Sequence, residues 1–304
     1  MPENSIVSQI IRFGLWLAQL PSPRMALRLA GLAARLLLLI DSDAAKVTRV
    51  NIALCFPELS EREVKILVRR SLTDMVLLLF EFAQMAHWPE QTLMAQILRV
   101  EGEDLLKECY DSDRGVLLLV PHFGNWELLC AFLGLNYSVA ALYAPPKVAA
   151  LEPAILSARE RFGGALFAID TAGMRKILRV LKQGKLVAIL PDQVPDRNAG
   201  GVYADFFGHP ALTMSLVHRL IDKTAPHVLI AAVQRQQTDS GYGYVARFEP
   251  LLDPVEGLDA QGCAAVLNRS IERVVRRAPE QYQWEYKRFK RPPKDGRESV
   301  YRRQ

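Results

Sequence analysis

Cysteine is scarce in this sequence, and its spacing suggests no structural site. Four cysteines occur among 304 residues, at positions 55, 109, 130 and 263, and no two of them form a CxxC pair. A disulfide scaffold and a cysteine-ligated zinc module are therefore excluded, and a reducing compartment is expected. The first residues also lack the layout of a cleaved signal peptide, so secretion is not expected.

Long uninterrupted apolar runs are absent as well. Residues 13–40 are strongly apolar, yet proline and arginine keep every run below the roughly 18 residues that a transmembrane helix needs. The interrupting residues are Pro21, Pro23, Arg24, Arg28 and Arg35.

Ser22 followed by Pro23 is typical of a helix start, so a helix is predicted from there to about Ile40. Its three arginines fall on one narrow stripe of an otherwise apolar cylinder. This pattern predicts a helix that lies in the headgroup layer of a membrane. A core helix with one exposed face and a tilted membrane span are the alternatives.

Charge is unevenly distributed along the chain. The net charge is +5, and residues 282–304 alone hold eight Lys/Arg against three acidic residues, so the rest sums to zero. A uniform nucleic-acid-binding surface is therefore not expected. A basic C-terminal tail near an anionic surface or partner is predicted, with a merely solvated tail as the alternative.

The remaining sequence alternates short apolar runs with helical patterns. Ser60-x-x-Glu63 is a capping box, and it predicts a helix that ends at Trp88-Pro89. From Gly115 onward, strands are predicted at 116–120, 139–143, 166–169, 185–190, 227–233 and 242–249. Helices are predicted from 125 and at 152–162, 174–183 and 213–224.

This alternation predicts an α/β fold with a single, mostly parallel central sheet flanked by helices. The turn at 239–241 predicts an antiparallel hairpin at one edge of the sheet. Residues 1–110 are predicted to form a helical, membrane-interfacial region. Residues 111–304 are predicted to form the α/β catalytic region with the basic tail.

Two predicted strands end in polar residues. One runs into Pro121-His122-Phe123-Gly124-Asn125-Trp126-Glu127, and the other into Pro191-Asp192-Gln193. In open parallel sheets, functional groups gather at the carboxyl ends of the strands. A histidine there, with a carboxylate in the first turn of the next helix, can act as a general base. His122 and Glu127 are therefore the candidate pair.

Motifs of several other enzyme classes are missing. The sequence has no G-x-S-x-G elbow, no Walker A motif, no Rossmann G-x-G-x-x-G and no H-E-x-x-H. A general base without a protein nucleophile or cofactor indicates direct attack by a substrate hydroxyl, as in acyl transfer from a thioester.

Taken together, the motifs resemble the late acyltransferases of lipid A biosynthesis. These are the lauroyl and myristoyl transferases of Gram-negative bacteria, within the lysophospholipid acyltransferase superfamily. The resemblance covers nearly the whole chain. It is carried by His122-x4-Glu127, Pro191-Asp192-Gln193, Phe206-Phe207-Gly208 with Pro210-Ala211, Pro279-Glu280-Gln281-Tyr282-Gln283-Trp284 with Lys287-Arg288-Phe289-Lys290, and Asn51-Ile52-Ala53-Leu54-Cys55-Phe56-Pro57.

The resemblance implies transfer of a fatty acyl group from acyl carrier protein to a hydroxyl of a lipid A precursor. The reaction would take place at the cytoplasmic face of the inner membrane, without a metal or other cofactor. His122 would accept the proton of the hydroxyl, and Glu127 would orient the imidazole. The implied partners are acyl carrier protein, the lipid A precursor and an anionic membrane surface, and no nucleic acid.

The resemblance also assigns roles to other polar residues. Arg159 is expected to stabilise the oxyanion or to bind a substrate phosphate, with Arg161 as the second candidate. A surface pair with a neighbouring glutamate is the alternative for both. Asp192 is expected to orient Arg159 or to hold the loop at 193–205, or merely to cap the next turn.

The chain departs from the family pattern at two places. It reads Tyr143-Ala144-Pro145 where many members have Tyr-Arg-Pro, and Lys147 is a possible substitute for that arginine. His209 stands where a lysine or arginine is common, and a structural role is favoured for it. Trp284 and Tyr286, beside Lys287, Arg288 and Lys290, are expected to form an interfacial strip, or else to cap the core.

Three other functions fit parts of the pattern. The same pair of residues could acylate another membrane lipid, such as a lysophospholipid, an ornithine lipid or a glycolipid. The fold could also serve a non-catalytic protein that binds the membrane surface. A zinc hydrolase using His122, Glu127 and His209 lacks closely spaced ligands and is disfavoured.

Overall fold

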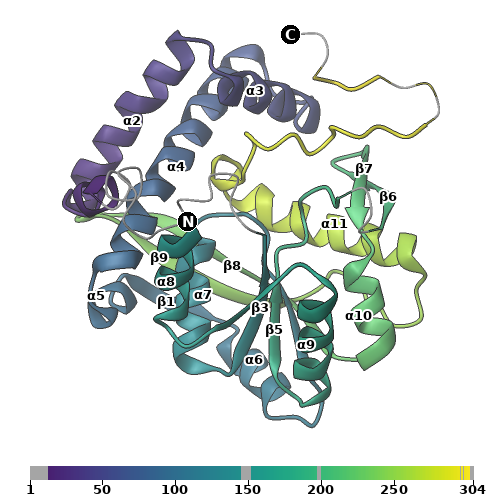
Figure 1. Ribbon diagram of the computed structural model, residues 1–304. Coiled ribbons are helices and arrows are strands. Elements are labelled where there is room, and N and C mark those ends of the chain that lie inside the picture. Colours follow the sequence, from purple (N-terminus) through teal and green to yellow (C-terminus); the bar gives the residue numbers. More distant parts are fainter. Residues whose placement is uncertain (1–12, 145–151, 197–199, 295, 297, 302–304) are drawn as a thin grey trace.

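A computed structural model describes residues 13–144, 152–196, 200–294, 296 and 298–301 (Figure 1). Its centre is a seven-stranded sheet with the order β1-β9-β8-β2-β5-β3-β4. Neighbouring strands are parallel except for the antiparallel pair β8 and β9. The strands are β1 (Ile97–Glu101), β2 (Val116–Leu119), β3 (Val139–Tyr143), β4 (Ala165–Ala168), β5 (Leu186–Ile189), β8 (His227–Thr238) and β9 (Gly241–Pro250).

Helices cover both faces of this sheet (Figure 1). The helices include α2 (Pro23–Leu39), α3 (Asp43–Cys55), α4 (Glu61–His87), α5 (Glu90–Met94), α6 (Glu103–Tyr110), α7 (Trp126–Asn136), α8 (Glu152–Glu160), α9 (Thr171–Lys182), α10 (Leu216–Thr224), α11 (Ala260–Arg277) and the short 3-10 helix η2 (Pro279–Gln281). The mostly parallel sheet flanked by helices is the architecture predicted from the alternating pattern.

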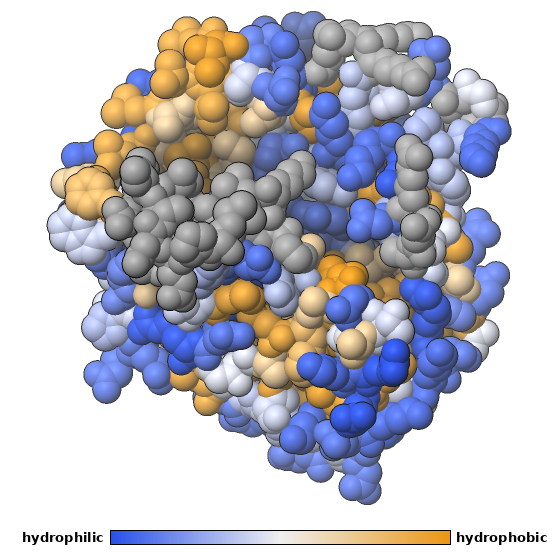
Figure 2. Space-filling model, in the orientation of Figure 1, coloured by the Kyte–Doolittle hydropathy of each residue, from blue (hydrophilic) through white to orange (hydrophobic). Residues whose placement is uncertain are grey.

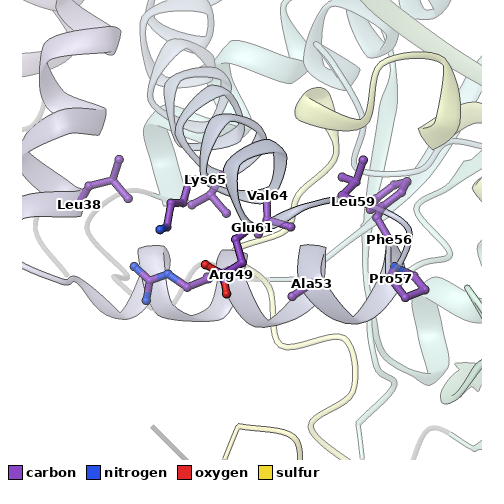
Figure 3. A pocket seen from close by; sticks show the side chains of 10 residues that line it. Leu38, Arg49, Ala53, Phe56, Pro57, Leu59, Glu61, Val64 and Lys65 are labelled. Atoms are coloured by element: carbon purple, nitrogen blue, oxygen red, sulfur yellow. The ribbon is translucent and has the colours of Figure 1, made fainter.

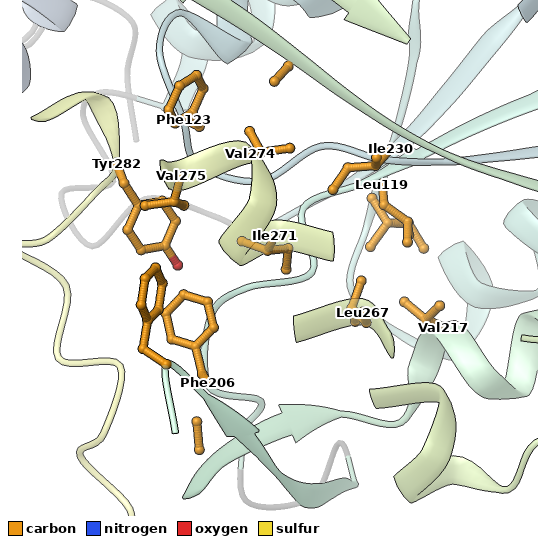
Figure 4. Packing of buried hydrophobic residues seen from close by; sticks show 14 of the residues in the cluster. Leu119, Phe123, Phe206, Val217, Ile230, Leu267, Ile271, Val274, Val275 and Tyr282 are labelled. Atoms are coloured by element: carbon orange, nitrogen blue, oxygen red, sulfur yellow. The ribbon is translucent and has the colours of Figure 1, made fainter. Parts of the chain in front are cut away.

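The core lies on the two faces of the sheet because successive side chains of a strand point to opposite sides. In β2, Leu117 and Leu119 face the cluster formed with α9, α10 and α11. Val116 and Leu118 face the cluster formed with α6, α7, α8 and part of α4. Figure 4 shows the first cluster, where Leu119 lies close to Ile230. The predicted strand at 116–120, buried on both faces, is confirmed.

Local signals fix the starts of the N-terminal helices. The Ser22 side chain accepts from the backbone N–H of Met25 at the start of α2. At the start of α4, the capping box between Ser60 and Glu63 is complete. Both predicted helices are therefore confirmed, and α4 ends at the predicted position, with Trp88 as its C-cap.

The helix α2 packs on α4 through a stripe of small residues. Ala26, Ala30 and Ala34, spaced four residues apart, are fully buried. Their size lets the two helices approach closely, and the larger side chains of α2 are left on the outside. The exposed large apolar side chains of α2 and the segment around it are Phe13, Trp16, Leu17, Leu20, Met25, Leu29, Leu32, Leu36, Leu39 and Ile40. Figure 2 shows an apolar region over α2, at the upper left.

Among the described residues, no helix is both long enough and apolar enough to cross a bilayer.

Parts of the fold differ from the sequence prediction. The region 1–110 is not helical throughout, because β1 pairs with β9 and forms one edge of the central sheet. The hairpin of β8 and β9 therefore lies inside the sheet and not at its edge. A second hairpin, β6 (Gly201–Phe206) with β7 (His209–Met214), ends one residue past 213, where the sequence predicts the start of a helix.

The C-terminal segment after η2 runs back over the helical layer towards α3 (Figure 1). The Asn51 side chain donates to the backbone carbonyls of Trp284 and Tyr286, and the Tyr301 hydroxyl donates to Asn51. The Asn51 motif seen in the sequence thus holds the C-terminal segment in place. A buried amide with all these partners is typical of a structural anchor.

Candidate active site

The carboxyl ends of β2 and β5 bring His122 and Asp192 together. The two strands are adjacent and parallel, with Leu119 opposite Ile189. His122 and Asp192 each follow that pair by three residues, so the register places them side by side. Nδ1 of His122 lies 2.7 Å from Oδ1 of Asp192, and the backbone N–H of His122 donates to Oδ2 at 2.9 Å.

The environment of Asp192 fixes the proton on the imidazole. Burial opposes ionisation of this carboxyl, but attraction to His122 and the hydrogen bonds from its ring and backbone lower the pKa of Asp192. Because a carboxylate only accepts hydrogen bonds, Nδ1 of His122 carries a proton. In the neutral ring, Nε2 is then the nitrogen with the free lone pair.

The loop that carries His122 is held by backbone contacts. Gly124 has a positive φ of 58°, and a Cβ added there would lie 1.8 Å from the carbonyl oxygen of Val233. The N–H of Gly124 donates to the carbonyl of Gln281, and the N–H of Asn125 donates to the carbonyl of Val233. Only glycine permits this close approach of the loop to β8.

The Glu127 carboxylate lies in the first turn of α7, as the sequence predicts. Asn125 caps that helix by accepting from the N–H of Leu128. Glu127 binds Arg159 of α8 in a bidentate pair, with Nε–Oε2 at 2.8 Å and Nη2–Oε1 at 2.5 Å. Burial works against the charge of Arg159, but attraction to Glu127 outweighs it and raises the pKa of the guanidinium.

These pairs differ from the expected ones. The carboxylate at Nδ1 of His122 comes from Asp192 and not from Glu127. Both carboxylate oxygens of Glu127 bind Arg159, so the partner of Arg159 is Glu127 and not Asp192 or a neighbouring glutamate. The physical reason is the sheet register, which places Asp192 beside His122, whereas Glu127 lies on the helix that faces α8.

A row of amides lies on the other side of the imidazole. Nε2 of Gln193 lies 3.2 Å from Nε2 of His122 and donates to Oε1 of Gln283 at 3.0 Å. The backbone N–H of Gln283 donates to the carbonyl of His122 at 3.1 Å. The sequence contained both glutamines within its motifs, but no role was predicted for either.

A buried cluster of charges supports the loop from beneath. Arg235 of β8 binds Glu81 of α4 in a bidentate pair, and its Nη1 donates to Asp74 at 2.7 Å. Arg235 also donates to the carbonyl of Gly124 at 3.4 Å. Burial raises the pKa of Asp74 to about 7, against the attraction of Arg235. No role was predicted for this cluster from the sequence, although an arginine two positions after the predicted strand at 227–233 was a possible signal.

Several other predicted residues lie outside the His122 cluster. Arg161 donates to the carbonyls of Met85, Ala86 and Trp88 and so binds the C-terminal end of α4. His209 contacts the carbonyl of Leu54. Within the described ranges, no three His, Cys, Asp or Glu side chains are arranged to hold a metal ion.

The residues around the missing arginine are only partly described. Tyr143 donates to Glu152 at 3.3 Å. Pro145 and Lys147 lie outside the described residues.

The predicted C-terminal strip is only partly at the surface. Trp284 is 1% exposed and packs on Phe56 with ring centroids 5.7 Å apart. Arg288 is also buried and donates to Thr213. The expectation of an interfacial strip is therefore wrong for these two residues, which belong to the core. Lys287 and Lys290 remain exposed.

A cavity of about 460 Å³ lies between α3 and the start of α4 (Figure 3). Its lining is largely apolar and includes Phe56 and Leu59, with the charged side chains of Arg49, Glu61 and Lys65 grouped on one side. Its lining includes none of the residues that contact His122. We therefore locate the candidate active site at the sheet edge and not in this cavity.

Known proteins of one kind match this chain. A family model described as bacterial lipid A biosynthesis acyltransferase matches residues 1–291. The chain is 31% identical to a lipid A biosynthesis palmitoleoyltransferase of Escherichia coli (strain K12), over 94% of this chain and 92% of that protein. It is 27% identical to the lipid A biosynthesis lauroyltransferase of the same strain, over 92% of this chain and 90% of that protein. It is 25% identical to the lipid A biosynthesis myristoyltransferase of that strain, over 79% of this chain and 73% of that protein.

Proposed function

The chain belongs to the family of bacterial lipid A biosynthesis acyltransferases, and we propose that it transfers a fatty acyl group from acyl carrier protein to a hydroxyl of a lipid A precursor. The observation that carries the mechanism is the imidazole of His122, whose Nδ1 is held by Asp192. Membership of the family makes the protein an O-acyltransferase of lipid A biosynthesis. The donor, the base and the site residues are our proposals.

In the proposed reaction, Nε2 of His122 accepts the proton of the acceptor hydroxyl. The hydroxyl oxygen attacks the carbonyl carbon of the thioester and forms a tetrahedral oxyanion. The carbon–sulfur bond then breaks, and the leaving thiolate takes the proton from Nε2. The products are the new ester and the free thiol of the carrier, so the base is regenerated. Asp192 holds the ring and stabilises its cation while it exists.

We assign Arg159 to the oxyanion or to a phosphate of the acceptor. Its bidentate pair with Glu127 uses Nε and Nη2, which leaves Nη1 outside the contact with that carboxylate. In this proposal, Glu127 acts by fixing the position of the Arg159 guanidinium. This assignment replaces the expected role of Glu127 as the group that orients the imidazole. A guanidinium held from one side is a preorganised electrostatic donor.

We place the exposed apolar face of α2 in the headgroup layer of the inner membrane, at its cytoplasmic face. Arg24, Arg28 and Arg35 are exposed on the same helix as the apolar residues. Arginine side chains can reach lipid phosphates while the apolar side chains enter the acyl region. Such a position supports access to a lipid acceptor. The exposed Lys287 and Lys290 fit acidic acyl carrier protein or anionic headgroups.

A product assay tests the proposed function. Membranes that contain the wild type, His122→Ala or His218→Ala are incubated with acyl carrier protein thioesters of several lengths and a tetra-acylated lipid A precursor. We expect a mass gain of one acyl chain with the wild type and with the His218→Ala control, whose histidine contacts the carbonyl of Leu258. His122→Ala should lose at least about 10²-fold in rate, as expected for loss of a general base.

The other candidate acceptors are tested in the same assay. Acylation of a lysophospholipid, an ornithine lipid or a glycolipid, with none of the lipid A precursor, would contradict the proposed substrate. Full activity of His122→Ala would contradict the proposed base. The names of the three relatives refer to different acyl groups: palmitoleoyl, lauroyl and myristoyl. The series of donors therefore also measures which chain length this protein prefers.

A further inference from the structure

The side chain of Gln193 contacts Nε2 of His122, the atom that accepts the proton in the proposed mechanism. Its Nε2 lies 3.2 Å from Nε2 of His122. An amide nitrogen is only a donor, so this contact requires an imidazole whose Nε2 has no proton. The lone pair that would accept the proton of a substrate hydroxyl is thus already engaged by a protein group.

The orientation of the amides is fixed from both ends. At one end, the carboxylate of Asp192 requires the proton of His122 to be on Nδ1. At the other end, the amide of Gln193 meets the side chain of Gln283. The Gln283 carbonyl then faces Gln193 and accepts from its amide at 3.0 Å. The amide group of Gln193 therefore donates one hydrogen to Gln283 and the other to His122.

The backbone near Gln193 is tied to the C-terminal segment. The N–H of Val194 donates to the Tyr286 hydroxyl at 2.9 Å, and Arg291 donates to the carbonyl of Pro195 at 2.7 Å. These bonds hold the chain on which the glutamine sits. Movement of Gln193 away from the base is therefore a rotation of its side chain about single bonds, which exposed or partly exposed side chains make rapidly.

From this geometry we propose that Gln193 is a removable cap on the general base. When no acceptor is bound, its amide covers Nε2 of His122 and keeps water from being activated there. The acceptor hydroxyl displaces the amide, which keeps its hydrogen bond to Gln283. Gln193 must leave Nε2 in any case, because a protonated Nε2 and an amide N–H are both donors. The cap thus favours transfer to the lipid over hydrolysis of the thioester.

The hydrolysis that the cap suppresses would use the same base, with water in place of the acceptor hydroxyl. Nε2 takes a proton from water, the hydroxide oxygen attacks the thioester carbonyl, and the carbon–sulfur bond breaks. The thiolate regains the proton, and a free fatty acid leaves. This inference rests on the proposed function, since it requires His122 to be the base.

The test is the partition of a labelled acyl group between two products. Acyl carrier protein with a radiolabelled acyl chain is incubated with the full-length protein, with and without the lipid A precursor, and free fatty acid and acylated lipid are counted. Gln193→Leu keeps the size of the side chain and removes the amide. We expect the ratio of hydrolysis to transfer to rise about tenfold, the effect of losing one hydrogen bond of about 1.4 kcal/mol. Gln283→Leu should act in the same direction.

A purely structural role for Gln193 would lower hydrolysis and transfer in parallel and leave their ratio unchanged, and that result would overturn the proposal. An unchanged rate of hydrolysis in Gln193→Leu would also overturn it. Gln183→Leu, the same change at the exposed C-cap of α9, is the matched control and should leave the ratio as in the wild type. His122→Ala distinguishes a failure of the proposal for Gln193 from a failure of the proposed function. If both products persist without His122, the proposed base itself is wrong.

Discussion

Nδ1 of His122 and Oδ1 of Asp192 lie 2.7 Å apart although 70 positions separate the two residues in sequence. Glu127 is only five positions from His122, yet its carboxylate binds Arg159. Proximity in the chain therefore does not decide which carboxylate holds the imidazole. The parallel register of β2 and β5 decides that Asp192 holds it.

This arrangement predicts that substitutions of Asp192 and Glu127 have different effects on the tautomer of His122. Asp192→Asn should lower the rate of acyl transfer by about 10²-fold or more, because an amide no longer fixes the proton on Nδ1. NMR of ¹⁵N-labelled histidine should show a changed tautomer for His122 in this variant. In Glu127→Gln the rate should fall while the tautomer stays the same. A tautomer change in Glu127→Gln alone would contradict the assignment.

The pair of Glu127 and Arg159 should be coupled in stability. Their side chains are 8% and 25% exposed, so removal of one partner leaves a poorly solvated charge. We expect Glu127→Gln and Arg159→Met each to cost about 2 kcal/mol in urea unfolding, and the double variant to cost clearly less than the sum. The exposed pair of Arg269 and Asp253 is the control and should show a coupling of at most about 1 kcal/mol.

Gly124 should tolerate no side chain. Gly124→Ala combines a positive φ of 58° with a Cβ 1.8 Å from a backbone oxygen, so we expect a loss of about 3 kcal/mol or more and a displaced His122. Gly257→Ala is the matched control, because its φ is 75° but nothing lies within 4 Å of the added Cβ. It should cost only about 1 kcal/mol in chemical denaturation. Equal losses of stability in the two variants would show that backbone strain alone, without the close contact to Val233, accounts for the effect at Gly124.

The buried cluster of Arg235 predicts a pH dependence. The pKa of Asp74 rises from 3.8 to about 7 on folding, so the unfolded chain releases this proton at lower pH than the folded chain. The stability of the wild type relative to Asp74→Asn should therefore fall as the pH rises from about 4 to about 7, and level off above that. Urea unfolding at several pH values measures the difference.

The control for this pH series is Asp253→Asn, whose side chain is 55% exposed. Its stability difference from the wild type should vary little over the same range. A constant difference for Asp74→Asn as well would mean that the Asp74 carboxyl titrates alike in both states.

The membrane contact of α2 is tested by charge reversal. Replacement of its three arginines by glutamate should release the protein from sedimenting anionic vesicles, since each basic residue near such a surface contributes about 1 kcal/mol. The same reversal at Arg175, Lys176 and Arg179 of α9 gives an equal change in net charge far from α2 (Figure 1). Equal release by both triple variants would indicate an effect of net charge and not a contact of α2.

The sequence by itself determined the features that depend on near neighbours. Ser22 and Ser60 cap helices through bonds to residues three positions away, so their helices begin where they were predicted. The apolar run of β2 is buried on both faces, and this places His122 at a strand end. Capping and periodicity act within one or two turns of chain, which is why pattern alone suffices for them.

The tertiary structure alone decided the pairing of the charged groups and the place of the edge elements. Strand β1 is partly exposed and carries Arg99 and Glu101, so its pattern resembles a loop until β9 pairs with it. The partners of His122, Glu127 and Arg235 come from distant elements, and the energy of a buried charge depends on which elements meet. That meeting is set by strand order and register, which spacing along the sequence does not contain.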